Sequence, residues 1–206
     1  MTERLVLHEY STSGNCYKVR LAAAMAGVRL ELREYDIMKG ETRTPEFLQH
    51  VNAGGRIPVL QVGDRFIPES NAAAYYVAEG SNLIPTDPFD HADMLRWMFW
   101  EQYSHEPNIA TLRFWMRSVG VESLTELQRL QMTGKRQAGN AALKQMDDHL
   151  AGRGWFVGDS TSLADLCLFA YTHLAGEADF DLKRYPNVQQ WIERVKGHPR
   201  YVAMMS

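Results

Sequence analysis

A polar segment near the N-terminus, Ser11-Thr12-Ser13-Gly14-Asn15, could bind an anion. It follows an apolar run and precedes a stretch of helical periodicity, so it would lie at the start of a helix. The first N–H groups of a helix have no partner within the helix and carry about half a positive charge, which stabilises an anion or a thiolate. Ser13 or Asn15 could add a hydrogen bond. Alternatively, these residues only cap the helix.

A second segment, Gly54-Gly55-Arg56-Ile57-Pro58, precedes a strand-like apolar run. Proline is tolerated at the start of a strand where its missing N–H is not needed. A cis bond between Ile57 and Pro58 would turn the N–H and C=O of Ile57 toward a ligand, and a peptide could then pair there as an extra strand. The alternative is an edge-strand proline that follows a glycine turn.

A third segment, Glu69-Ser70, opens another helical stretch. Ser70 at the helix start can satisfy one backbone donor and leave the others for a bound carboxylate. Glu69 can pair with an ammonium group. An α-amino acid carries both charges, so the segment could hold such a head group, although an ordinary helix cap has the same residues.

Strand and helix patterns alternate quickly around these segments, from residue 4 to about residue 80. We expect strands at 5–7 and 29–35, a helix that ends before Gly27, a short helix that Pro45 opens, a hairpin across 58–67 and a helix at 72–78. Thr44 is expected to cap the short helix, and Gly63-Asp64 to turn the hairpin. The order βαβαββα predicts an α/β domain over residues 1–80.

The rest of the chain has only helical periodicity. A stretch with two prolines, within 81–90, is expected to be a linker, and 91–206 an all-α helical bundle. The apolar residues at helical spacing are Leu95, Met98, Phe99, Tyr103, Leu143, Met146, Leu150, Leu163, Leu166, Ala170, Leu174, Val188, Trp191, Ile192 and Val195.

Composition and charge exclude several classes of protein. The 206 residues are 45% hydrophobic and 23% charged, as expected for a globular protein with a substantial core. The net charge of −3 provides no positive field to attract nucleic acid or an anionic membrane. No basic segment followed by an apolar stretch begins the chain, and no run approaches about 20 apolar residues, so we expect a soluble cytoplasmic protein.

Metal and nucleotide chemistry have no sequence support. Two cysteines, Cys16 and Cys167, lie far apart and lack the spacing of a metal site or a disulfide framework. The seven histidines show no His-x-x-x-His pair, and the glycine-rich loops that hold nucleotide phosphates are missing. We therefore expect no metal.

Taken together and in this order, the three segments resemble the cytosolic glutathione S-transferases, in particular bacterial serine-type members similar to the theta and zeta classes. The resemblance covers essentially the whole chain. It implies a thioredoxin-like N-terminal domain, an all-helical C-terminal domain, glutathione as co-substrate and a homodimer. In the second half, Ser162 and Asp165 resemble the reciprocal pair of the family's structural capping box.

The resemblance also implies roles for individual residues. Ser13 falls where serine-type members carry the hydroxyl that activates the thiol, with Asn15 as a second donor or replacement and Tyr10 as the tyrosine-class alternative. Arg56, assisted by Lys39, would meet the glycyl carboxylate. The remaining glutathione-binding residues would be Ile57, Pro58, Glu69 and Ser70.

The second substrate, a small hydrophobic electrophile, would have to be bound by apolar side chains. An aromatic cluster surrounds Pro107, which is expected to kink a helix and free backbone carbonyls. The expected pocket residues are Tyr10, Phe99, Tyr103, His105 and Trp115. Alternatively, the cluster is interhelical core and His105 is a core or surface histidine.

Three functions follow from these patterns. The first is conjugation of the glutathione thiolate to an electrophile. The second is a glutathione-dependent peroxidase or disulfide reductase on the same scaffold, although the helix starts with Ser13 where redox relatives have the attacking cysteine, and Cys16 is expected to be a packing residue. The third is a non-catalytic binding protein that retained the fold.

Overall fold

A computed structural model describes residues 4–204 of the chain. The chain divides into two compact units. One comprises the described residues up to Ile84 together with those from Pro199 onward, and the other is Pro85–His198. The C-terminal residues therefore pack with the first unit, whereas the boundaries expected from the sequence place them in the helical domain.

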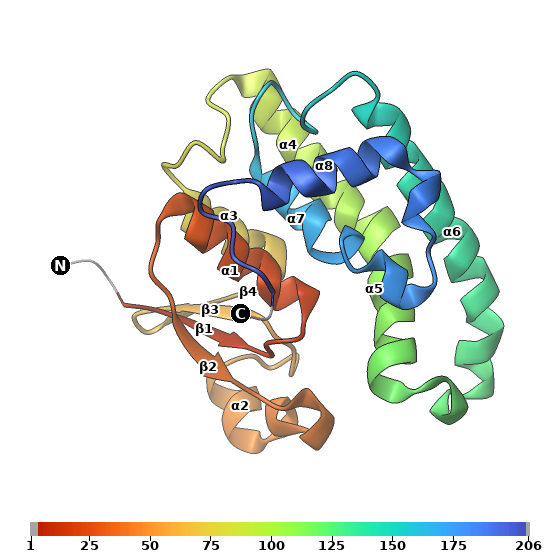
Figure 1. Cartoon of the computed structure of the whole chain (residues 1–206). Helices are drawn as coiled ribbons and strands as arrows, with labels where there is room; N and C mark the ends of the chain where they lie inside the picture. Colours follow the sequence, from red (N-terminus) through yellow and green to blue (C-terminus); the bar gives the residue numbers. More distant parts are fainter. Residues whose placement is uncertain (1–3, 205–206) are drawn as a thin grey trace. The chain divides into compact units, whose positions relative to one another are not determined.

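The first unit has the expected order βαβαββα (Figure 1). Two 3-10 turns, Ile37–Lys39 and Glu41–Arg43, follow the second strand. The regular elements are β1 (Leu5–Glu9), α1 (Gly14–Ala26), β2 (Glu31–Glu34), α2 (Pro45–His50), β3 (Val59–Val62), β4 (Arg65–Pro68) and α3 (Ser70–Ala78).

The sheet is mixed, with strand order β2-β1-β3-β4. β1 pairs with β2 in parallel and with β3 antiparallel, so Leu7 lies opposite both Leu32 and Leu60. α1 and α3 pack together on one side of the sheet, and α2 lies on the other (Figure 1). The buried core between the sheet and the two helices includes Leu7, Val19, Leu21, Leu60, Ala73 and Ala74. This packing brings the N-terminal ends of α1 and α3 close to each other.

Local sequence explains where the short elements begin. Thr44 accepts a hydrogen bond from the Phe47 N–H at 3.3 Å and so caps α2, whose first residue is Pro45. Gly27 ends α1 at φ 76°, and its N–H donates to the last carbonyls of that helix. The expected cap, the proline start and the glycine stop are all confirmed.

Every regular element in the described residues of the second unit is a helix, as expected. Two π-helical turns, Glu101–His105 and Trp115–Val119, flank α5. Its α-helices are α4 (Pro88–Trp100), α5 (Glu106–Phe114), α6 (Glu126–Leu150), α7 (Leu163–Thr172) and α8 (Pro186–Lys196). α7 is buried along its whole length, which explains why it is almost entirely apolar.

The capping box before α7 is confirmed. The Asp165 carboxylate accepts hydrogen bonds from the Ser162 N–H at 2.8 Å and from the Trp191 indole N–H at 2.9 Å. Burial raises the pKa of Asp165, while these donors act in the opposite direction. The box therefore also ties α7 to α8.

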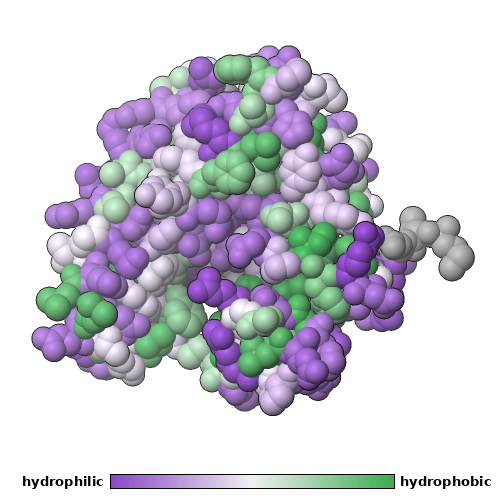
Figure 2. All heavy atoms as spheres, turned by 180° about the vertical axis from the view of Figure 1, so that it is seen from behind, coloured by the Kyte–Doolittle hydropathy of each residue, from purple (hydrophilic) through white to green (hydrophobic). Residues whose placement is uncertain are grey.

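Apolar and polar residues are interspersed over the face of the molecule seen in Figure 2. Within residues 4–204, no helix combines the length and the hydropathy that a membrane span requires.

Candidate functional site

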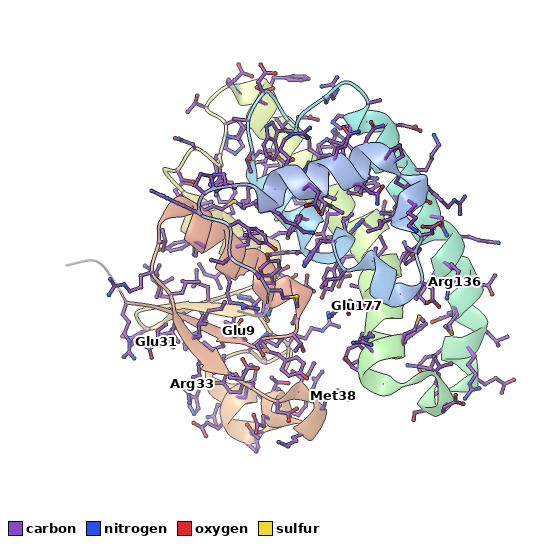
Figure 3. The ribbon with its side chains drawn as sticks, viewed as in Figure 1. Glu9, Glu31, Arg33, Met38, Arg136 and Glu177 are labelled. Atoms are coloured by element: carbon purple, nitrogen blue, oxygen red, sulfur yellow. The ribbon has the colours of Figure 1, made fainter. Side chains whose placement is uncertain are left out.

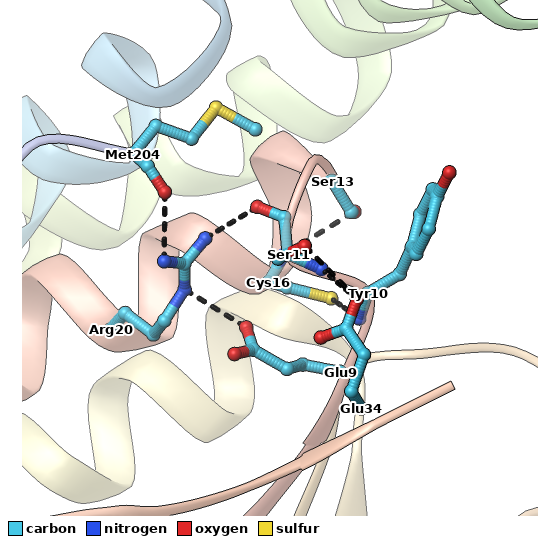
Figure 4. A network of polar contacts seen from close by, with 8 residues as sticks. All are labelled: Glu9, Tyr10, Ser11, Ser13, Cys16, Arg20, Glu34 and Met204. Atoms are coloured by element: carbon cyan, nitrogen blue, oxygen red, sulfur yellow. Dashed lines mark hydrogen bonds and ion pairs between the residues drawn. The ribbon is translucent and has the colours of Figure 1, made fainter. Parts of the chain in front are cut away.

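Ser13 is the N-cap of α1, and its hydroxyl can donate a hydrogen bond as well as accept one. Its Oγ accepts a hydrogen bond from the Cys16 N–H at 3.4 Å, and its own N–H donates to the Tyr10 carbonyl at 2.8 Å (Figure 4). The Ser13 side chain also interacts with the Cys16 thiol, a weak acceptor whose pKa this hydrogen bond lowers. Capping uses a lone pair of the oxygen and not its proton. The two interpretations of Ser13, helix cap and thiolate donor, are therefore compatible.

Asn15 and Ser70 join the two helix N-termini. The Ser70 hydroxyl donates to Asn15 Oδ1 at 3.3 Å, and it accepts from the Lys18 ammonium at 3.5 Å. Ser70 and Lys18 are both buried. A buried cation and two helix N-termini, each with unpaired N–H groups, create a positive potential around Ser70. This arrangement suits a carboxylate.

Glu69 adopts an unusual backbone conformation directly before α3. Its φ is 72° and its ψ is 115°, and its carbonyl accepts the Ala73 N–H at 2.9 Å. Positive φ in a residue with a Cβ costs about 1–3 kcal/mol and persists at ligand clamps where the surroundings enforce it. The side chain is exposed, and its carboxylate has no partner within residues 4–204. Glu69 can therefore meet a ligand ammonium.

The peptide bond between Ile57 and Pro58 is cis. A turn before it is held by Asn52, whose side chain accepts from the Gly54 N–H and donates to the Arg56 carbonyl, both at 2.9 Å. No described residue takes the hydrogen bonds of the Ile57 N–H and C=O, which leaves them available to an extended peptide.

The two cations expected at the glycyl end are exposed. Lys39 lies in the turn after β2, and its ammonium is 3.1 Å from Asp36 Oδ2. That hydrogen bond raises the pKa of Lys39, although an exposed pair contributes little to stability. Arg56 is exposed beside Ile57. The contacts of the described residues connect neither cation to Ser13, Asn15 or Ser70.

Cys16 and Tyr10 lie close to Ser13 but differ in access. The Cys16 thiol is buried and accepts the Tyr10 N–H at 3.4 Å. Burial raises the pKa of Cys16 to about 12, so this thiol is not a nucleophile at neutral pH. The Tyr10 ring points away from the polar network drawn in Figure 4.

The aromatic residues expected to bind the electrophile have different environments in the helical unit. Phe99 and Tyr103 are 71% and 88% exposed. Trp115 and His105 are buried. His105 Nε2 lies 2.9 Å from Thr172 Oγ1, whose own hydrogen goes to a backbone carbonyl at 2.6 Å, so the imidazole donates. These contacts favour the alternative that His105 is a core residue.

Sequence reasoning missed three features close to the candidate site. They are the buried Lys18, the turn-forming Asn52 and the ion pair between Arg20 and Glu9. A lysine between Tyr17 and Val19, in a helix of mostly apolar residues, was a usable signal for a buried charge. Within residues 4–204, no group of three or more His, Cys, Asp or Glu side chains could hold a metal ion.

The first unit is a thioredoxin-like domain in which the N-termini of α1 and α3 lie together, and it is joined in one chain to a helical unit. Two family models match: "Glutathione S-transferase, N-terminal domain" over residues 5–79 and "Glutathione S-transferase, C-terminal domain" over residues 116–199. The chain belongs to the glutathione S-transferase family.

Individual relatives agree with this placement. A crystal structure of a glutathione S-transferase from Pseudomonas fluorescens Pf-5 is 40% identical, with a TM-score of 0.91 over 98% of this chain and 99% of the other. A glutathione S-transferase-like protein LUC7 from Fusarium is 28% identical over 91% of this chain and 86% of its own length. Elongation factor 1-gamma 3 from Oryza sativa is 29% identical over 96% of this chain, which spans only 47% of that protein.

Proposed function

We propose that this protein is a glutathione transferase that conjugates the thiolate of glutathione to small hydrophobic electrophiles. The observation that carries the proposal is the Ser13 hydroxyl, which caps α1 through its oxygen, so that its hydrogen can turn from the weakly accepting Cys16 thiol to a bound thiolate. Membership of the family supports the proposal.

The γ-glutamyl group of glutathione is held at the start of α3. The Glu69 carboxylate pairs with the γ-glutamyl ammonium. The α-carboxylate lies against Ser70 and the first N–H groups of α3, close to the Lys18 ammonium. The N–H and C=O of Ile57 pair with the cysteinyl backbone, next to Pro58. Arg56, with Lys39, meets the glycyl carboxylate.

The thiol is activated at the start of α1. A free thiol has a pKa of about 8.5, so only a few per cent is ionised at neutral pH. Lowering that pKa by two units requires about 2.7 kcal/mol of preferential stabilisation of the thiolate. A hydrogen bond from the Ser13 hydroxyl and the helix N-terminus together supply energies of this order. The Asn15 amide is a second donor. The thiolate then attacks an electrophilic carbon, a C–S bond forms and the leaving group departs.

Phe99 and Tyr103 are the better candidates for contact with the electrophile, because both are exposed on their own unit. Tyr10 remains a candidate in the first unit. His105 and Trp115 are buried within the helical unit, so a role for them would require that unit to open. We also propose that two copies of the chain form a homodimer, as members of the family do.

The test is a titration of the purified protein with glutathione, followed by the absorbance of the thiolate across pH. The variants are Ser13→Ala and, as a matched control, Ser11→Ala. The Ser11 hydroxyl donates to Glu34 at 3.0 Å and so is already occupied. We expect wild type and Ser11→Ala to ionise the bound thiol near neutral pH and Ser13→Ala to bind glutathione but ionise it only at higher pH. Failure of wild type to bind millimolar glutathione would refute the proposal.

A non-catalytic role is the second candidate, because a relative over nearly the whole chain is an elongation factor subunit. In that case glutathione would be bound without turnover of any electrophile. Steady-state assays with 1-chloro-2,4-dinitrobenzene and with cumene hydroperoxide separate conjugation, peroxidase activity and the absence of both. Turnover of the hydroperoxide above conjugation would favour the peroxidase alternative.

A further inference from the structure

Arg20 on α1 contacts three separate parts of the first unit. Its Nε lies 2.9 Å from Glu9 Oε2 at the end of β1. Its Nη2 donates to the Ser11 carbonyl at 2.6 Å, in the loop between β1 and α1. Its Nη1 donates to the Met204 carbonyl at 2.8 Å (Figure 4). One guanidinium thus joins the strand, the loop that leads to Ser13 and a segment at the opposite end of the sequence.

That distant segment, residues 199–204, which we call the C-terminal tail, is fixed along α1 by two further side chains. The Tyr17 hydroxyl donates to the Val202 carbonyl at 2.7 Å. The Arg200 guanidinium donates to the Met25 carbonyl at 3.3 Å, near the C-terminal end of α1. The tail therefore supplies backbone acceptors to both Tyr17 and Arg20.

The loop between β1 and α1 is held from two sides. Arg20 holds the carbonyl of Ser11, and Glu34 Oε1 accepts both the N–H of Ser11 at 2.8 Å and its hydroxyl at 3.0 Å. Ser11 is two residues before Ser13. The direction of the Ser13 hydroxyl consequently depends on the backbone contacts of Ser11, its N–H to Glu34 and its carbonyl to Arg20, which Ser11→Ala would keep.

We propose that Arg20 is a positioning residue for thiol activation, and that the C-terminal tail is part of the same device. Arg20 acts through the loop: it aligns the Ser13 hydroxyl with the bound sulfur and is itself aligned by the Met204 carbonyl. The inference rests on the proposed role of Ser13 and adds a contribution from Met204, 184 positions after Arg20 in the sequence.

Burial makes this arrangement sensitive to small changes. The side chains of Arg20 and Glu9 are 15% and 3% exposed, so their ion pair is poorly screened by solvent. Removing the cation would leave a buried carboxylate without its counter-charge and would destabilise the fold. Arg20→Lys keeps the positive charge but lacks the planar guanidinium that reaches three acceptors at once. The variant therefore tests how Arg20 positions the loop and not whether its charge is needed.

The experiment compares wild type, Arg20→Lys, a chain that ends at His198, and the control Arg194→Lys, which makes the same substitution at a guanidinium that donates to the Gly154 carbonyl in the helical unit. Two quantities are measured: the thiolate fraction of bound glutathione at pH 6.5 and the affinity for S-methylglutathione, which has no thiol to ionise. We expect Arg20→Lys and the shortened chain to lose about threefold or more in thiolate fraction, with affinity for S-methylglutathione unchanged. Arg194→Lys should behave like wild type.

A double variant makes the test specific to Ser13. In the Ser13→Ala background, Arg20→Lys should produce no further loss of thiolate, because the hydroxyl that Arg20 positions is absent. Equal thiolate fractions in wild type and Arg20→Lys would overturn the inference. A parallel loss of S-methylglutathione affinity would also overturn it, since Arg20 would then only maintain the fold. If wild type itself forms no thiolate, the proposed function is refuted together with this inference.

Discussion

Replacing Glu69 with glycine separates what this residue costs the fold from what it does for the ligand. Glu69 has φ 72° and ψ 115°, outside the regions that residues with a Cβ populate. The strain is about 1–3 kcal/mol. Glycine adopts this conformation without a clash but loses roughly 0.5–1 kcal/mol more in backbone entropy. The strain that is relieved exceeds the entropy that is lost, so the substitution should stabilise the folded protein.

We therefore expect Glu69→Gly to raise the free energy of unfolding by about 1 kcal/mol. For a chain of this length the melting temperature should rise by about 2–4 °C. We expect the affinity for glutathione to fall about tenfold or more, because the carboxylate proposed to meet the γ-glutamyl ammonium is lost. Urea denaturation measures the first effect, and titration calorimetry with glutathione measures the second.

Two controls separate strain from charge. Glu69→Gln keeps the Cβ and the backbone strain, so its stability should match wild type while its glutathione affinity falls. Asp179→Gly relaxes a positive φ of 59° in the helical unit, so it should leave glutathione affinity unchanged. If Glu69→Gly is no more stable than wild type, the backbone of Glu69 is not strained. If it is more stable but binds glutathione as wild type does, the role of its carboxylate is refuted.

Three further changes test other parts of the structure. Gly139→Ala should lower the free energy of unfolding by about 1–3 kcal/mol in urea, because the added Cβ would overlap Cζ of Phe180; an unchanged midpoint would show that the ring moves away freely. Burial lowers the pKa of His173 to about 4 in the folded protein, whereas the unfolded chain has the ordinary histidine pKa of about 6.5. As the pH drops below about 6.5, the unfolded chain therefore binds a proton that the folded protein does not, and stability falls. Between pH 7 and pH 5 this protonation should lower the free energy of unfolding by about 2 kcal/mol. Urea denaturation of His173→Phe at the two pH values should show a smaller decrease by that amount, and the same decrease in both proteins would contradict the prediction. Lys18→Met should weaken binding of S-methylglutathione, measured by calorimetry, because the ammonium that donates to Ser70 is removed; wild-type affinity would argue against a role in carboxylate binding.

The features that could be predicted from the sequence depend on neighbouring residues. The cap and proline at Thr44 and Pro45, the turn before β4 and the reciprocal pair Ser162 and Asp165 each lie within a few residues of their partners. The cis bond at Ile57 and the start of α3 at Ser70 are local in the same sense. Short-range chemistry was therefore sufficient for the fold and for much of the candidate site.

The features that could not be predicted depend on contacts across the chain. Lys18 reaches Ser70, and Arg20 reaches Met204, over separations that no periodicity encodes. His105 is a comparable case, because the partner that fixes its ring, Thr172, lies 67 residues further along the chain. Aromatic spacing indicated a helix but not which of its residues faces the core.

The two edges of the sheet have a consequence for how copies of the chain can associate. β2 is short, and its exposed residues include Glu31 and Arg33 (Figure 3). β4, at the other edge, ends with Pro68, which has no N–H to donate. Charged side chains and proline both disfavour the pairing of strands from different molecules. The first unit is thus protected against aggregation through a continuous sheet, and association of copies must use side-chain surfaces instead.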